Sequence, residues 1–119
     1  MDYELKDCTR PGAELKDTGF GYTLSLIGGK YKMIIIYSLA QHGNTMRFNE
    51  LHRFIGNVSF TALSTALKEL DASGLVERKE FPQIPPRVEY SLTELGKSLK
   101  PILDSMWAWG EEYKSLMSE

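Results

Sequence analysis

Apolar and polar positions along this chain recur with helical spacing over most of its length. Residues 30–41 are apolar almost all round, which predicts a helix in the middle of a core. His42-Gly43-Asn44 ends this helix, with Gly43 as the expected left-handed cap. Ahead of it, a short apolar segment at residues 22–27 ends at Gly28-Gly29. The first third of the chain therefore predicts one central helix and a shorter apolar element before it.

Two shorter amphipathic helices joined by a tight turn follow. The first is predicted to begin with Asn49 as N-cap and to end at Ile55, before the turn Gly56-Asn57. Ser59 is expected to cap the second helix by accepting from its first-turn N–H groups, and Gly74 to end it. Apolar residues at helical spacing predict the buried sides of the two helices. In the first helix these are Phe48, Leu51 and Ile55, and in the second Phe60, Leu63, Leu67 and Leu70. At about 100° per residue, the opposite side of the second helix holds Thr61, Thr65, Lys68 and Ala72, with Ser64 flanking them.

A β-hairpin is predicted next. Residues 75–81 and 87–92 read as strands, the second with clean alternation of apolar and polar side chains. Between them, residues 82–86 carry three prolines, which cannot continue a strand ladder and restrict the backbone. The hairpin is therefore expected to have a stiff tip.

The chain ends in a predicted long helix from Thr93 onward, capped by Thr93 or by Ser91 with Glu94. Pro101 is expected to kink or divide it. Its apolar residues follow an unbroken heptad spacing: Leu95, Leu99, Ile102, Met106, Trp109, Tyr113 and Leu116. A domain this small cannot cover so much apolar surface, so the pattern predicts a dimer interface with a second copy of the chain.

Composition narrows the class of protein. With 119 residues, 42% hydrophobic and 25% charged, the chain is expected to form one globular domain, with the polar residues 1–17 as an N-terminal arm. No apolar run is long enough to span a bilayer and no secretory signal is visible, so the cytoplasm is the expected location. The formal net charge is −2, but residues 30–100 carry ten basic against seven acidic side chains. Positive charge therefore lies on the part that would meet a phosphate backbone.

Helix, turn, helix, hairpin and long helix, in this order, are typical of a winged helix-turn-helix, which binds double-stranded DNA through its second helix. The fold class is thus mainly α-helical with a small β-hairpin wing. Cations are needed at phosphates and short polar groups at base edges. The candidates are Ser59, Thr61, Ser64, Thr65, Lys68, Arg47, Arg53, Lys30 and Lys32. The alternative is a winged helix that binds protein and not DNA.

Arg87, at the base of the stiff loop, suits a minor groove, whose negative potential attracts guanidinium. Its alternative role is a cross-strand partner of Glu80 or Glu77.

Other chemistry is poorly supported. Two histidines and one cysteine have no zinc spacing, and no catalytic triad or carboxylate pair is present, so neither an enzyme nor a cofactor or metal is predicted. Cys8 is a possible redox or electrophile sensor, and otherwise a free thiol on the N-terminal arm.

Four stretches carry a family resemblance: LIGGKYKMIIIYSL (26–39), RFNELHRFI (47–55), LKELDASGLVERKEFPQIPPRVEYSLTELGKSLKPIL (67–103) and WAWG (107–110). They closely resemble the HxlR-type family of bacterial transcriptional regulators, winged helix-turn-helix proteins related to the MarR group. The resemblance covers roughly residues 18–113, and its PPRVEYSLTELG block is the most specific part.

The resemblance implies a homodimer on a palindromic operator, with helical dimerisation elements at both termini. The recognition helix would be residues 59–73 and the wing 83–87, within a DNA-binding unit at 47–91 and a dimerisation helix at 93–117 of a single domain (1–119). Some family members sense electrophiles through a cysteine just before the apolar segment at residues 22–27. Here Thr18 holds that place, and Cys8 lies ten residues upstream. No effector is predicted.

Overall fold

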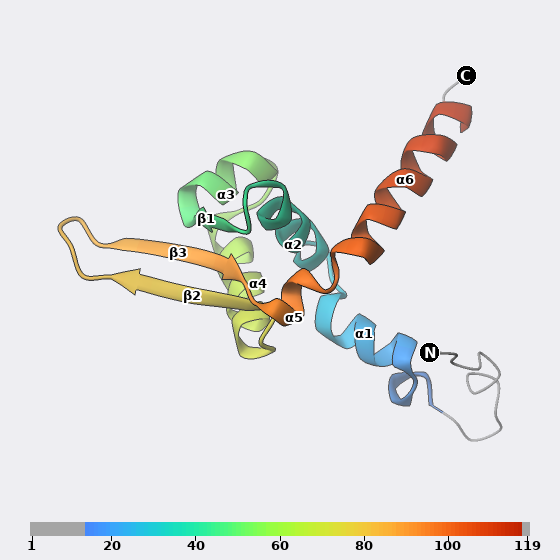
Figure 1. Ribbon diagram of the computed structural model, residues 1–119, viewed down its shortest axis with the longest axis horizontal. Helices are drawn as coiled ribbons and strands as arrows, with labels where there is room; N and C mark the ends of the chain where they lie inside the picture. Colours follow the sequence, from blue (N-terminus) through green and yellow to red (C-terminus); the bar gives the residue numbers. More distant parts are fainter. Residues whose placement is uncertain (1–13, 118–119) are drawn as a thin grey trace.

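The computed structural model describes residues 14–117, whose helices and strands are arranged as in Figure 1. Apart from a short 3-10 helix, η2 (Leu15–Asp17), the elements are six helices and three strands. The helices are α1 (Gly19–Ile27), α2 (Lys32–Gln41), α3 (Phe48–Ile55), α4 (Phe60–Ala72), α5 (Glu94–Lys97) and α6 (Lys100–Met117). The strands are β1 (Thr45–Arg47), β2 (Val76–Phe81) and β3 (Arg87–Leu92). The mainly helical fold with a small β wing is the one that the sequence predicts.

Helix α2 lies at the centre of the core, as its apolar sequence predicts. It contacts α3, α4, α6 and two strands of the sheet. Ile35, Ile36 and Leu39 are fully buried, whereas Ile34 is 44% exposed, so one side of this helix remains uncovered. The predicted stop is confirmed, because Gly43 and Asn44 both adopt positive φ at the end of the helix.

The sheet has one strand more than the sequence predicts. The strand order is β1-β3-β2, both pairs antiparallel, with Thr45 opposite Ser91 and Phe81 opposite Arg87. Strand β1 has only three residues, with Met46 buried between two exposed neighbours. A single alternation is too short to stand out in a sequence, which is why this strand was not predicted. Through its pairing with β3, strand β1 connects the start of α3 to the sheet.

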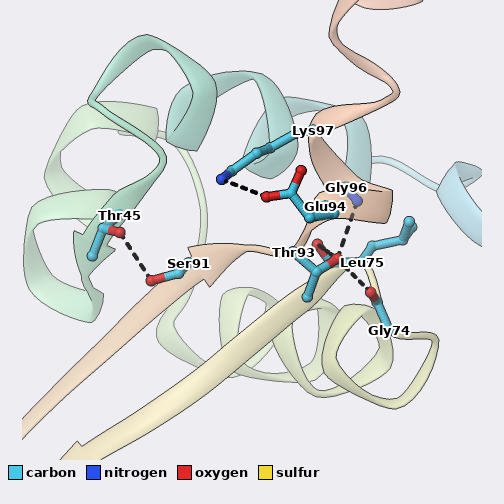
Figure 2. Close-up of polar contacts among 8 residues, drawn as sticks. All are labelled: Thr45, Gly74, Leu75, Ser91, Thr93, Glu94, Gly96 and Lys97. Atoms are coloured by element: carbon cyan, nitrogen blue, oxygen red, sulfur yellow. Dashed lines mark hydrogen bonds and ion pairs between the residues drawn. The ribbon is translucent and has the colours of Figure 1, made fainter.

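The sheet joins the C-terminal helices through Thr93 (Figure 2). Its hydroxyl donates to the carbonyl of Gly74 (2.6 Å) and accepts from the backbone N–H of Gly96 (3.1 Å). Gly96 packs closely on the backbone of Leu75, since a Cβ at Gly96 would lie 2.2 Å from the Leu75 carbonyl oxygen. The predicted Thr93 cap is therefore confirmed. The same residue also holds the end of α4 against α5.

Two local predictions in the helix-turn-helix are wrong. Helix α3 begins at Phe48, one residue before the predicted N-cap Asn49, and Glu50 Oε1 accepts from the N–H of Arg47 at 2.9 Å. Phe60 was expected in the buried stripe but is 60% exposed, although Leu63, Leu67 and Leu70 are fully buried as predicted. Phe60 is the first residue of α4, and its ring packs on the rings of His52 and Phe48 of α3 instead of entering the core.

The predicted C-terminal helix is divided near Pro101, as expected, into α5 and α6. Its heptad series is consequently interrupted, with Leu95 on α5, Leu99 between the helices and the other five residues on α6. Near the start of α6, Lys100 Nζ donates to Asp104 Oδ2 at 2.8 Å. This hydrogen bond raises the pKa of Lys100 above its ordinary value. Helix α6 then projects away from the core, on the side opposite the wing (Figure 1).

Candidate nucleic-acid interface

Helices α3 and α4 form a helix-turn-helix whose turn is held from both sides. Gly56 takes a positive φ of 85°, and Val58 is buried beneath the turn. His52 Nε2 lies 2.8 Å from the carbonyl oxygen of Val58, so a hydrogen bond from α3 fixes the approach to α4. Ser59 then caps α4, accepting from the N–H of Ala62 at 3.0 Å. The predicted turn and cap are both confirmed.

The polar side of α4 is open to solvent. Thr61, Thr65 and Lys68 are exposed, and Ser64 is half-buried beside them. Within residues 14–117, the side chains of these four residues form no hydrogen bond or ion pair with the rest of the chain. They are therefore free to bind an external partner, as the pattern of the sequence predicts.

Three arginines line a cavity of about 650 Å³ between the start of α3 and the wing. Arg47 and Arg53 come from the α3 side and Arg87 from the wing, and Asn49 and Gln83 add amide groups to the lining. Glu50 is the acidic residue in this lining, and its carboxylate is already bonded to a backbone N–H. We call this cavity the arginine cleft. Its excess positive charge and amide donors suit the phosphate groups of a nucleic-acid backbone.

Arg87 does not form the cross-strand ion pair that was predicted as its alternative role. The register sets Glu80 opposite Val88 and Arg87 opposite Phe81, so no cross-strand pair with Glu80 forms. The guanidinium instead lies 4.1 Å from the centre of the Phe81 ring, and its Nε is 3.4 Å from Glu89 Oε2 on the same strand. These two contacts hold the arginine at the start of β3, next to the β2–β3 loop, where it lines the arginine cleft.

The two lysines before α2 have different surroundings. Lys30 is exposed, and together with Thr65 of α4 it lines a small cavity. Lys32, in contrast, is largely covered and forms an ion pair with Glu69 of α4 at 3.0 Å. Lys30 thus remains available to a phosphate beside α4, whereas the charge of Lys32 is used within the protein.

Helix α6 has two apolar sides. One packs against the molecule, where Leu103 is buried and the ring of Trp107 lies 5.8 Å from that of Tyr37. The other is uncovered in one copy of the chain, with side chains between 43% and 65% exposed. We call it the α6 stripe: Ile102, Met106, Trp109, Tyr113 and Leu116. Leu95, on α5, is likewise 56% exposed, and Leu99 is half-buried.

Further apolar surface continues from α6 onto neighbouring helices. An open groove of about 860 Å³ lies between α2, α3 and α6, lined by residues that include Ile34, Phe54 and Met106. Helix α1 adds Phe20 and Tyr22, which are 62% and 63% exposed. The uncovered apolar area is thus concentrated on the two terminal helices and the groove beside α6.

Sequence reasoning missed two features of this surface. Phe60 was assigned to the core because its spacing from Leu63 and Leu67 fits the buried stripe. Gln83 was treated only as part of the wing tip, since nothing in the sequence brings it near the start of α3. Periodicity within one helix cannot indicate where a neighbouring element stops covering it.

The part of the chain that the structure describes contains neither a candidate metal site nor a cysteine. Residues 14–117 contain no group of three or more His, Cys, Asp or Glu side chains able to hold a metal ion. His42 and His52 each lie within hydrogen-bonding distance of a backbone carbonyl oxygen. Cys8, the predicted sensor candidate, lies outside the described residues. No helix between residues 14 and 117 is long and apolar enough to cross a membrane.

Comparisons with known proteins match this architecture. Residues 26–118 match the family model for the HxlR-like helix-turn-helix. An HTH-type transcriptional regulator of Halalkalibacterium halodurans is 58% identical over 96 residues, which are 81% of this chain and 84% of the relative.

Solved structures agree with these matches. The redox regulator HypR in its reduced form superimposes with a TM-score of 0.78 at 40% identity, covering 85% of this chain and 98% of HypR. A MarR-family transcriptional regulator from Porphyromonas gingivalis superimposes with a TM-score of 0.77 at 34% identity, covering 87% and 98% of the two chains.

Proposed function

Because this chain belongs to the HxlR-like helix-turn-helix family of DNA-binding transcriptional regulators, we propose that it acts as a homodimer on a palindromic operator. Each copy would place α4 in a major groove and the β2–β3 loop against the neighbouring minor groove. The family favours this function over the alternative of a winged helix that binds only protein. The protein would act in the cytoplasm by binding, without catalysing a reaction.

The observation that carries the proposal is the open polar side of α4, together with the arginine cleft between α3 and the wing. Thr61, Ser64 and Thr65 offer short polar groups to base edges, and Lys68 adds a charge. The arginine cleft supplies cations for the phosphates of one strand, and Lys30 supplies one on the other side of α4. Phosphate contacts made by these cations would fix the register of α4 on the duplex.

The α6 stripe supports the homodimer. Five large apolar side chains on one side of a helix, each at least 43% exposed, form a patch that monomeric proteins rarely leave uncovered. A twofold axis at this stripe would let two copies of α4 reach half-sites about 34 Å apart, one helical turn of DNA. An operator with two such half-sites is palindromic because the protein is symmetric.

Gel-shift titration of the DNA upstream of the gene, at several salt concentrations, tests the proposal. Binding through phosphates must weaken steeply with salt, by about 0.9 in the log–log slope per phosphate contact. Replacing both Thr65 and Lys68 with alanine should weaken binding while leaving the fold intact, because both side chains are exposed. Absence of binding to upstream and neighbouring promoters at low salt would refute DNA recognition.

A thiol-regulated form of this function is the second candidate, supported by the likeness to a protein described as a redox regulator. Cys8 is the single cysteine of the chain, so any thiol response must use it. Diamide treatment followed by the gel shift tests this, with Cys8→Ser as the matched variant. A diamide response that persists in Cys8→Ser would exclude Cys8 as the sensor.

A further inference from the structure

Phe60 is a large apolar side chain at the start of the recognition helix, where polar contacts to DNA are expected. It is 60% exposed, and it stands between the capping residue Ser59 and the candidate base contact Thr61. The first residues of a recognition helix are those that reach base edges in a major groove. A ring at this position therefore lies in the region that the bases would occupy.

The Phe60 ring is held rigidly on its inner side. It stacks on the imidazole of His52, with ring centres 4.1 Å apart and planes 13° from parallel. It also lies beside Phe48, at 5.9 Å and 20°, and the Phe48 ring in turn contacts Tyr90 of the wing strand β3. His52 is itself fixed, because its Nε2 is 2.8 Å from the carbonyl oxygen of Val58 in the turn.

Such bracing distinguishes Phe60 from an ordinary exposed apolar residue. A single exposed side chain usually carries no function. Here two rings of α3, His52 and Phe48, contact the Phe60 ring directly, Tyr90 of β3 packs behind Phe48, and the outer part of the Phe60 ring stays open. A ring whose orientation is already fixed loses little conformational entropy on binding, so its contacts with a partner contribute fully to affinity.

We propose that Phe60 reads thymine in the operator, by contact of its ring with the 5-methyl group in the major groove, and that His52 and Phe48 are positioning residues for it. The inference rests on the proposed function and deepens it. The thymine methyl is the apolar group that unmodified B-DNA presents in the major groove, and phenylalanine is among the side chains that contact it. The polar residues Thr61, Ser64 and Thr65 would read the neighbouring base edges.

Replacement of thymidine by deoxyuridine in the operator tests the inference directly. This change removes the methyl group and leaves every hydrogen-bonding group of the base pair in place. In operator duplexes carrying single replacements in one half-site, the wild-type protein should bind about fourfold more weakly at one or two positions, the effect of one buried methyl group. Phe60→Ala should bind thymine and uracil duplexes with equal affinity.

Lys68→Ala is the matched control, because it should lower affinity for all duplexes while keeping the difference between thymine and uracil. His52→Ala should reduce that difference without abolishing binding, a result that a purely structural role for His52 would not produce. Phe60→Ala should fold because Phe60 is exposed, and circular dichroism would verify the fold.

Three outcomes overturn this reading. If wild type binds thymine and uracil duplexes equally at every position, Phe60 does not read a methyl group. If Phe60→Ala retains the discrimination, another residue is responsible for it. If wild type binds no operator at all, the proposed function fails and the inference fails with it, so the two failures are distinguishable.

Discussion

Gly96 shows at the scale of one residue how closely the parts of this domain approach one another. Its backbone N–H donates to the Thr93 hydroxyl, and a Cβ at this residue would lie only 2.2 Å from the carbonyl oxygen of Leu75. No side chain fits there without moving the backbone between α4 and β2. The junction between the wing and the C-terminal helices therefore depends on the absence of a side chain at this position.

Gly96→Ala is accordingly expected to destabilise the protein by about 1–3 kcal/mol, the usual cost of overpacking. Urea denaturation at fixed protein concentration would measure it. Gly19→Ala is the matched control, because a Cβ at Gly19, the first residue of α1, meets no atom within 4 Å. The control should change the free energy of unfolding by no more than about 0.5 kcal/mol. Equal effects of the two variants would contradict the contact at Gly96.

Arg53 belongs to the arginine cleft and is exposed, so its predicted role is electrostatic and independent of DNA sequence. Arg53→Ala should weaken binding to all operator sequences alike and reduce the log–log salt slope by about 0.9 if it neutralises one phosphate. Lys97→Ala removes the same charge from α5, where Lys97 pairs with Glu94, and should leave the slope unchanged. An unchanged slope for Arg53→Ala would remove this residue from the phosphate contacts.

At the scale of an element, the first turn of α4 has both a structural and a proposed functional role. The N–H groups of a first turn have no partner within the helix, and here Ser59 Oγ accepts from one of them, the N–H of Ala62. The same turn is expected to face the DNA. An acidic cap would suit the helix, because negative charge is favourable at a helix N-terminus. It would oppose the DNA, because phosphates are negative too. The two roles of this turn can therefore be separated by charge.

Ser59→Asp should keep or slightly raise stability and yet weaken operator binding, since it caps the helix and repels phosphate. Ser59→Asn is the control, because it caps without charge and should preserve both properties more closely. Ser59→Ala, which removes the cap, should cost about 1 kcal/mol of stability. Thermal denaturation and gel shifts on the three variants would measure these effects. Undiminished binding by Ser59→Asp would show that the first turn of α4 does not approach the phosphates.

Elements with several turns or alternations were predictable from the sequence, and the exceptions have physical causes. Leu63, Leu67 and Leu70 were placed correctly because spacings of four and three residues define one side of a helix. Phe60 was not, because its exposure depends on where α3 and the wing end. Strand β1 escaped notice because three residues hold no repeat. The arginine cleft combines residues some forty positions apart, so only the fold could bring them together.

At the scale of the whole molecule, the wing and α6 project from opposite sides of the core (Figure 1). The candidate DNA contacts lie mainly on α3, α4 and the wing, whereas the α6 stripe lies on the C-terminal helix. One copy can therefore use both surfaces at once. This separation is what a dimeric regulator needs, since a partner on α6 does not cover the groups that would meet DNA.

Trp109→Glu tests the α6 stripe as the dimer interface. Trp109 is 65% exposed in one copy, so a charge there should leave the fold of each chain intact. In a dimer it would bury an unpaired carboxylate, which costs several kcal/mol and should shift the protein to monomers. Sedimentation equilibrium would measure the assembly state, and monomers should bind a full operator much more weakly because each half-site is then occupied independently.

Ala108→Glu supplies the matched control for this prediction. Ala108 is exposed on the same helix, and at about 100° per residue it points roughly 100° or more away from most of the stripe. The same charge at this position should leave the dimer and its operator affinity nearly unchanged. A wild-type chain that sediments as a monomer, or a Trp109→Glu variant that remains dimeric, would show that the stripe is not the interface. Dissociation by both variants would instead attribute the effect to charge anywhere on α6.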